Sequence, residues 1–205
     1  MAKQFKCELI SWGEVYRLSA LLSRQVKDAG YLPDVVVAIA RGGYVPARLV
    51  CDFLDIYNLT DMRISHYTAG SSKEETARLS SPLCMEIKGL KVLIVDDITD
   101  TGDTVKVALQ HLREFGPAEV KVAVLQHKKQ STLKPDFYAK TLVKWRWIIY
   151  PWAVVEDIGG FLRAMPELPA TVEAADRMLK TDHGVTVPLR TLVQVFKMIE
   201  KDRYR

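Results

Sequence analysis

Two adjacent carboxylates, Asp96 and Asp97, directly follow the apolar run Val92–Val95. This run has no polar alternation, which predicts a strand buried on both faces of a parallel sheet, with the acids at its carboxyl end. Ligands bind at that end of open α/β sheets. Residues 101–104 then form a small, hydroxyl-rich loop ahead of a helical pattern, and backbone N–H groups at a helix start favour a phosphate dianion. The stretch therefore predicts a sugar-phosphate site.

The oxygen atoms of this segment indicate its chemistry. Asp96 and Asp97 can hold ribose hydroxyls and a hydrated Mg²⁺ ion, which prefers oxygen ligands and keeps several waters. Asp100 lies further along the same loop, and we expect it to face the reacting centre.

Three other interpretations of the acidic pair account for less of the segment. In ATPases a strand also ends in Asp, but this chain has no G-x-x-x-x-G-K loop for a triphosphate. Receiver domains need a third Asp at the end of a later strand, and the nearest candidate, Asp136, follows Pro135 in a polar stretch. A simple helix cap would use one acid and leave the other without a partner.

Strands and helices alternate along the chain, which predicts an α/β fold with a mostly parallel sheet and right-handed crossovers. A capping box at Ser11 and Glu14 predicts a long first helix that ends at Gly30. Val35–Ile39 predicts a buried strand that leads through a glycine loop into a helix. The other expected elements are strands over 62–67, 83–87, 91–95, 119–125 and 144–150, a turn at Gly89, a polar loop over 68–82, and helices over 171–180 and 188–201.

Composition is typical of a cytoplasmic enzyme domain. The chain has 205 residues, is 48% hydrophobic and can bury a sizeable core. No apolar run approaches about 18 residues and no signal sequence is visible, so no membrane partner is expected. The 3 cysteines are widely spaced, which favours buried free thiols over a disulfide or zinc site. Net charge is only +4, but basic residues outnumber acids over 121–147, a field that suits an anionic substrate.

The segment from Asp96 to Thr104 resembles the phosphoribosyl-pyrophosphate (PRPP) motif of type I phosphoribosyltransferases, in the acid-acid-x-x-Asp-Thr-Gly-x-Thr form of the 6-oxopurine enzymes. The resemblance implies a twisted, mostly parallel sheet flanked by helices, with a small hood region and here a helical C-terminal extension. We expect the enzyme domain over 1–158 and the extension over 159–205. It implies that Asp96 and Asp97 hold the ribose and Mg²⁺, and that the 5′-phosphate is bound by Thr99, Asp100, Thr101, Gly102, Asp103 and Thr104. Asp103 departs from the Lys or Gly of relatives, and it would lie near that phosphate.

The loop Ala40-Arg41-Gly42-Gly43 resembles the pyrophosphate loop of bacterial xanthine-guanine phosphoribosyltransferases. Its glycines allow close approach of the backbone to a ligand, and Arg41 supplies a permanent cation. The resemblance implies that Ala40, Arg41 and Gly42 bind pyrophosphate, and that in relatives the Ala40–Arg41 peptide is cis. The polar loop over 68–82 predicts a lid, because the reacting sugar must be screened from water. Tyr67 matches the lid tyrosine, whereas His66 replaces the usual Ser.

The base pocket is suggested by two further segments. Lys128 matches by position the lysine that donates to the purine 6-oxo group, and Lys129 is the near alternative. W-I-I-Y-P-W resembles W-I-x-x-P-W of the xanthine-guanine enzymes, which implies that Trp147 stacks on the purine and the Ile148 carbonyl reads the 2-position. Ordinary core packing remains an alternative for the tryptophans. Ala153 replaces the usual Asp after Pro-Trp, so hypoxanthine, guanine and xanthine are not separated.

The resemblance implies Mg²⁺-dependent transfer of the phosphoribosyl group from PRPP to a 6-oxopurine in purine salvage, with pyrophosphate as the other product. Asp100 would accept the proton near N7 as the general base, assisted by Lys128. A homodimer or higher homo-oligomer is expected. The alternative is a PRPP-binding transcriptional regulator that uses this fold without catalysis. The chain has no recognisable nucleic-acid reader motif, so nucleic acid is not an expected partner.

Overall fold

The computed structural model describes residues 5–67 and 73–202, and for side chains it omits 66–67, 73–76 and 200–202. These residues form two compact units. The first, called here the sheet unit, comprises residues 13–66 and 74–145, and the remaining described residues form the second, the C-terminal unit. The predicted division of the chain at residue 158 stays a prediction.

The sheet unit is built on six strands in the order β4-β3-β2-β5-β6-β7. Pairing is parallel from β3 through β7, which confirms the predicted mostly parallel sheet. The strands are β2 (Val35–Ala40), β3 (Leu59–Tyr67), β4 (Lys73–Ser81), β5 (Lys91–Thr99), β6 (Glu119–Lys128) and β7 (Phe137–Leu142).

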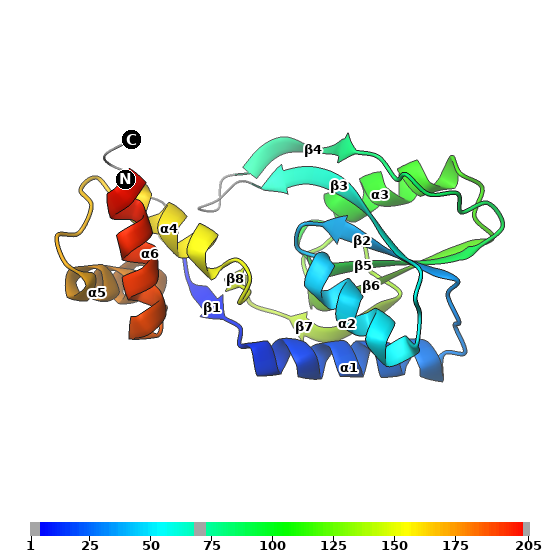
Figure 1. Cartoon of the computed structure of the whole chain (residues 1–205), viewed down its shortest axis with the longest axis horizontal. Helices are drawn as coiled ribbons and strands as arrows, with labels where there is room; N and C mark the ends of the chain where they lie inside the picture. Colours follow the sequence, from blue (N-terminus) through cyan, green and yellow to red (C-terminus); the bar gives the residue numbers. More distant parts are fainter. Residues whose placement is uncertain (1–4, 68–72, 203–205) are drawn as a thin grey trace. The chain divides into compact units, whose positions relative to one another are not determined.

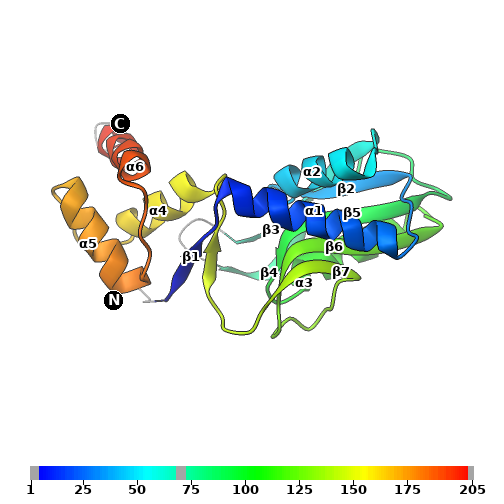
Figure 2. The same cartoon turned by 90° about the horizontal axis from the view of Figure 1, so that it is seen from below.

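Three helices cover the sheet. Figure 1 shows α1 (Trp12–Asp28) and α2 (Tyr44–Leu54) below the strands and α3 (Asp103–Arg113) above them. In Figure 2, which is seen from below, α1 lies in front of the strands. Because successive strand residues face opposite sides, alternate residues of β2, β5 and β6 pack with α3. All six residues of β2 are buried, as expected for a central parallel strand.

The edge of the sheet differs from the sequence prediction. A polar loop was expected over 68–82, but β4 occupies most of it and lies beside β3 as the sheet's outer strand (Figure 1). Polar residues suit an edge strand because its unpaired edge faces water. The polarity of this segment therefore did not distinguish a loop from an edge strand. Ser65 and Ser80 join the two strands through their hydroxyls, 2.9 Å apart. Residues 68–72 of the expected lid lie outside the described residues.

The prediction of a strand over 83–87 is wrong. These residues are irregular, yet Leu83 and Ile87 are buried in the α3 side of the core, so their hydrophobicity reflects packing and not strand pairing. The Leu83 N–H donates to Nε2 of His111 at 3.1 Å instead of to a neighbouring strand. The predicted turn is present, with Gly89 at φ 72°.

The C-terminal unit contains a small parallel sheet and three helices. Its elements are β1 (Cys7–Leu9), β8 (Trp147–Ile149), α4 (Val154–Arg163), α5 (Val172–His183) and α6 (Leu189–Asp202). Both predicted C-terminal helices are present, and Thr171 caps α5 by accepting from the Ala174 N–H. The strand expected over 144–150 is shorter, because only β8 pairs with β1.

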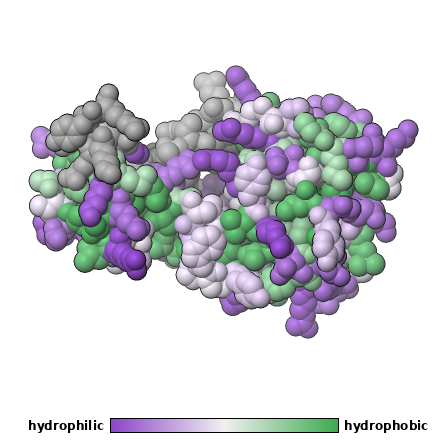
Figure 3. All heavy atoms as spheres, viewed as in Figure 1, coloured by the Kyte–Doolittle hydropathy of each residue, from purple (hydrophilic) through white to green (hydrophobic). Residues whose placement is uncertain are grey.

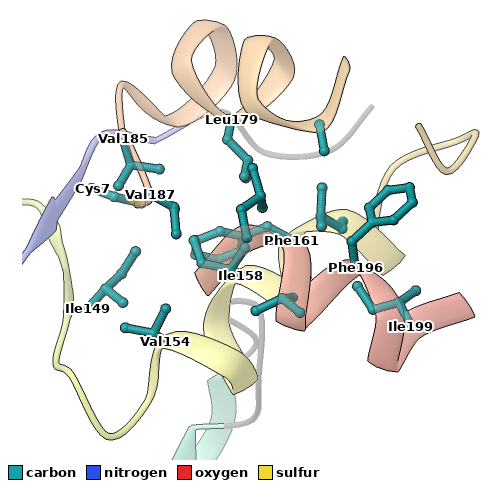
Figure 4. Packing of buried hydrophobic residues seen from close by; sticks show 14 residues of the cluster. Cys7, Ile149, Val154, Ile158, Phe161, Leu179, Val185, Val187, Phe196 and Ile199 are labelled. Carbon is teal, nitrogen blue, oxygen red and sulfur yellow. The ribbon is translucent and has the colours of Figure 1, made fainter. Parts of the chain in front are cut away.

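The helices of this unit enclose their own apolar core. Ile158, Phe161 and Leu179 point toward one another in Figure 4. Phe161 also contacts the rings of Phe5 and His183 at centroid distances of 5.4 and 4.5 Å. On the surface, apolar and polar residues lie side by side on the face shown in Figure 3. Within the described residues, no helix is both long enough and apolar enough to span a bilayer.

Phe161→Ala is expected to lower the free energy of unfolding by about 3–5 kcal/mol, because the aromatic ring is buried and its loss leaves a cavity. Val155→Ala on the same helix is the control, since Val155 is 43% exposed and should change stability little. Urea unfolding followed by circular dichroism measures both. Equal effects of the two substitutions would contradict the packing described for α4.

Candidate active site

The acidic pair lies at the carboxyl end of β5, as predicted. Asp96 is buried and Asp97 half-buried, and the Asp97 N–H donates to Oδ1 of Asp96 at 2.9 Å. The β5 strand extends beyond both acids to Thr99, and its pairing with β6 flanks Asp97, with Asp96 opposite Val124 and Ile98 opposite Gln126. A carboxylate pair on a paired strand has little freedom to move away from a ligand.

Both carboxyl groups are harder to ionise than exposed ones. Burial raises the pKa of Asp97 to about 7, against backbone N–H groups that lower it. Burial, and then the neighbouring Asp97, raises the pKa of Asp96 well above its ordinary value. Two adjacent acids that are shielded from water favour a cationic or proton-donating ligand, because either kind of ligand relieves their repulsion.

The glycine loop between β2 and α2 lies directly against this pair. A Cβ added to Gly42 would lie 2.5 Å from Oδ2 of Asp97, so no larger residue fits without moving the carboxylate. A Cβ added to Gly43 would lie 2.4 Å from the Val95 carbonyl oxygen. The Ala40–Arg41 peptide is cis, and Arg41 is exposed. The two segments predicted to bind PRPP are therefore brought together by the pairing of β2 with β5.

The predicted phosphate loop turns at Gly102, which has φ 93° and caps the N-terminus of α3. This left-handed conformation favours glycine, and an added Cβ would also lie 2.7 Å from Cβ of Leu133. Thr132, which is not part of this loop, donates two hydrogen bonds to the Thr101 carbonyl oxygen. Its N–H donates at 3.0 Å and its hydroxyl at 2.9 Å. The backbone N–H groups at the start of α3 can donate hydrogen bonds to an anion here.

Asp103, the departure from the family pattern, is compensated by its neighbours. Its carboxylate accepts from the Thr101 hydroxyl at 2.7 Å and from Nζ of Lys106 at 3.2 Å. Lys106 also donates to the Thr132 hydroxyl at 2.8 Å. An acid at a helix start is favoured by the helix dipole, and Lys106 offsets its repulsion of a phosphate.

Thr99 supports the site from the interior. Its hydroxyl lies 2.8 Å from Nδ1 of His127, and both side chains are buried. Burial lowers the pKa of His127, and Lys134 lowers it further, so the neutral ring is favoured. The hydroxyl of Thr99 is thus directed at β6, and a contact from this residue to phosphate would come from its backbone.

Asp100 and Lys128 meet because of strand register. Thr99 pairs with His127 in the β5–β6 ladder, and the same offset sets Lys128 beside Asp100. Nζ of Lys128 donates to Oδ2 of Asp100 at 2.7 Å, and the side chains are only 4% and 11% exposed. Burial lowers the pKa of Lys128, whereas Asp100 raises it. Separating such a buried pair is costly unless a polar atom of a ligand replaces the lost partner.

Lys129, the sequence alternative to Lys128, is exposed. Its N–H donates to the Leu142 carbonyl at 2.9 Å as part of the β6–β7 edge. Of the two lysines, Lys128 is the one described with a contact to Asp100, which favours Lys128 over Lys129 for the base-binding position.

Two residues that were not predicted complete the surroundings of Asp100. Gln130 donates to Oδ1 at 2.8 Å, and the indole N–H of Trp145 donates to Oδ2 at 3.3 Å. Nζ of Lys128 also lies 4.5 Å from the centroid of the Trp145 ring. Both follow the carboxyl ends of β6 and β7, the position where ligand contacts are expected, but β7 was itself missed in the sequence.

The remaining predicted site residues, Trp147, Ile148 and Tyr67, are described separately from the Asp100 cluster. Trp147 and Ile148 are on β8 in the C-terminal unit, where Trp147 packs near Phe5 at a centroid distance of 6.2 Å. Ile148 is 8% exposed. Tyr67 is the last residue of β3, and its side chain lies outside the described residues. Their contacts with a ligand stay predictions.

Comparison with known proteins identifies the family. The model of the phosphoribosyl transferase domain matches residues 9–157. The chain belongs to this family. It is 32% identical over 153 residues to a xanthine-guanine phosphoribosyltransferase of Ruegeria sp.. That match covers 70% of this chain and 83% of the Ruegeria protein. A xanthine-guanine phosphoribosyltransferase of Idiomarina loihiensis is 31% identical over 155 residues, covering 74% and 92%.

A solved structure shares the fold. The purine phosphoribosyltransferase from Pyrococcus horikoshii superposes with a TM-score of 0.62 at 30% identity, and the match covers 72% of this chain and 93% of that one. The predicted type I phosphoribosyltransferase fold is thereby confirmed.

Phosphoribosyltransferases generally use Mg²⁺ together with PRPP, and the acidic pair suits such an ion in part. Within the ranges that the structure describes, no three or more His, Cys, Asp or Glu side chains are grouped to hold a metal. Two adjacent carboxylates are nevertheless the oxygen donors that Mg²⁺ accepts when waters and substrate phosphates complete its shell. The residues therefore fit an ion that arrives with its substrate better than a permanently bound one.

Proposed function

We propose that this phosphoribosyltransferase transfers the 5-phosphoribosyl group of PRPP to a 6-oxopurine, giving a purine nucleotide and pyrophosphate. The contact of Asp100 with Lys128 carries this proposal. It sets a carboxylate and an ammonium group together beyond the phosphate loop, and a 6-oxopurine offers the matching pair, a ring N–H and a carbonyl oxygen. Names of relatives that act on xanthine and guanine support the same substrate class.

PRPP is held by the loops that follow β2 and β5. Asp96 and Asp97 bind the ribose hydroxyls and, through water, Mg²⁺. Thr101, Gly102 and Thr104 bind the 5′-phosphate with the N-terminus of α3, while Arg41 and the Gly42 backbone hold the pyrophosphate. The ion, when bound, neutralises the charge that develops on the leaving pyrophosphate.

Asp100 and Lys128 activate the base. Nitrogen N9 of the purine, or its equivalent, attacks C1 as the bond to pyrophosphate breaks. Asp100 accepts the proton released near N7, and Lys128 donates to the 6-oxo group. Trp147 stacks on the purine and the Ile148 carbonyl reads its 2-position.

The deciding experiment measures pyrophosphate release from PRPP with hypoxanthine, guanine, xanthine and adenine in turn. Turnover with one or more 6-oxopurines and little with adenine is expected. Because Ala153 replaces the usual Asp, the sequence does not separate hypoxanthine, guanine and xanthine. This assay determines which of them is used. PRPP binding without turnover on any base would instead support the regulator, which no described feature of the chain favours.

Lys128→Met is expected to raise KM for the base by about 10-fold or more, because it removes a hydrogen bond from a charged group. Lys129→Met is the matched control, and its KM should stay within twofold of wild type. Initial rates at saturating PRPP measure both. A larger defect for Lys129→Met would transfer the base-binding role to that residue.

We also propose a cytoplasmic location for the enzyme, in keeping with its proposed substrates, PRPP and a purine base. The expected homo-oligomer also stays a prediction, and light scattering after size exclusion measures it.

A further inference from the structure

Trp145 contacts both members of the Asp100–Lys128 pair at once. Its indole N–H donates to Oδ2 of Asp100 at 3.3 Å, the same oxygen that Lys128 contacts at 2.7 Å. Its ring face lies 4.5 Å from Nζ of Lys128, within the range of a cation–π interaction. One rigid side chain thus touches an acid through its edge and a base through its face.

The proposed reaction requires Lys128 to change partners. When Nζ donates to a purine 6-oxo group, Oδ2 of Asp100 loses its shortest described hydrogen bond. The carboxylate must still stay in line with the purine proton, since a displacement of about 1 Å can reduce a rate by about 100-fold. Trp145 and Gln130 remain as donors, one to each carboxylate oxygen.

The two remaining donors are not equivalent. Both side chains are exposed, but Gln130 is flexible, whereas Trp145 is planar and makes contacts through both its edge and its face. The indole also offers Lys128 a stabilising surface that does not depend on the carboxylate, which lowers the cost of leaving a buried cation without its anion.

We propose that Trp145 is a positioning residue that holds the Asp100 carboxylate in place while Lys128 moves from Asp100 to the purine oxygen. The inference rests on the proposed function. It assigns Trp145 a role distinct from stacking on the base, which is the role expected of Trp147.

Two substitutions separate the edge of the indole from its face. Trp145→Phe keeps an aromatic face for Lys128 but removes the N–H, and Trp145→Leu removes both. The readout is the single-turnover rate of nucleotide formation, because product release can mask the chemical step in steady state. Trp145→Phe is expected to lower this rate about 10-fold, the effect of one hydrogen bond to a charged group, with KM for PRPP within twofold. Trp145→Leu is expected to lower it further and also to raise KM for the base.

A double-mutant cycle distinguishes positioning from general support of the fold. In an Asp100→Ala background, Trp145→Phe should change the residual rate by less than twofold, because the carboxylate that it positions is gone. Trp12→Phe, at a tryptophan that is 58% exposed, is the matched control and should leave the rate unchanged. Thermal unfolding of each variant shows whether it is folded. If Trp145→Leu does not fold, Trp145→Phe alone is sufficient for the test.

A wild-type rate for Trp145→Phe, or an equal loss with and without Asp100, would overturn the inference. Failure of the wild-type protein to release pyrophosphate with every base would contradict the proposed function itself, which is a different outcome in the same assay.

Discussion

Asp100→Ala will lower the rate of purine transfer by about 10²-fold or more while PRPP binding is retained. General bases contribute about 10²–10⁴-fold, and Asp100 is the carboxylate that the structure sets beside Lys128. PRPP binding should survive because Asp96, Asp97, Thr101, Gly102 and Thr104, which are its main proposed ligands, are unchanged. Single-turnover rates and calorimetric titration with PRPP in Mg²⁺ measure the two quantities separately.

The alanine substitution also leaves Lys128 without its acid, so Asp100→Asn is needed as an isosteric companion. Asn keeps an oxygen for Lys128 but cannot take a proton, and the same loss of rate is expected. Asp52→Ala on α2 is the control, since Asp52 is 66% exposed and its described ion pair is with Arg48 on the same helix. Near-wild-type turnover in Asp100→Asn would remove the general-base role from Asp100.

Asp97→Asn will abolish turnover and yet make the ligand-free protein more stable at pH 8. The pKa of Asp97 is raised to about 7 by burial, compared with about 3.9 in an unfolded chain. Between these values the folded protein binds more protons than the unfolded chain, so stability falls as pH rises through this window. An amide has no charge to bury, and the substitution also relieves the repulsion that raises the pKa of Asp96.

The gain should be about 3–6 °C in Tm at pH 8 and smaller at pH 5, where wild-type Asp97 is already protonated. Thermal unfolding in EDTA at both pH values measures it, with Asp52→Asn as the exposed control. Saturating Mg²⁺ and PRPP should reverse the order, because only the wild-type protein gains stability from binding. An equal gain at pH 5 and pH 8 would show that ionisation of Asp97 is not the cause.

Such a gain would mean that the acidic pair is kept for binding at a cost in stability. Function commonly retains strained or desolvated groups of this kind. The same reasoning explains why residue 42 is glycine, because a side chain there would collide with the Asp97 carboxylate.

The parts of the site that were predictable are those built from one continuous segment. Asp96 and Asp97 follow their own apolar strand, and Gly102 and Thr104 begin the next helix, so strand, loop and ligand groups are adjacent in sequence. The polar strand β4 and the strand β7 were missed because neither shows a strong apolar alternation, and their pairing depends on neighbours already in the sheet.

The amino-acid sequence by itself determined the family, the mostly parallel sheet and the identity of the PRPP motif, because these depend on local patterns and on residue types at fixed spacing. Only the tertiary structure decided which residues surround Asp100. Lys128, Gln130 and Trp145 reach it from the ends of other strands, and strand register, which joins residues 28 to 45 positions apart, is set by the packing of the whole sheet.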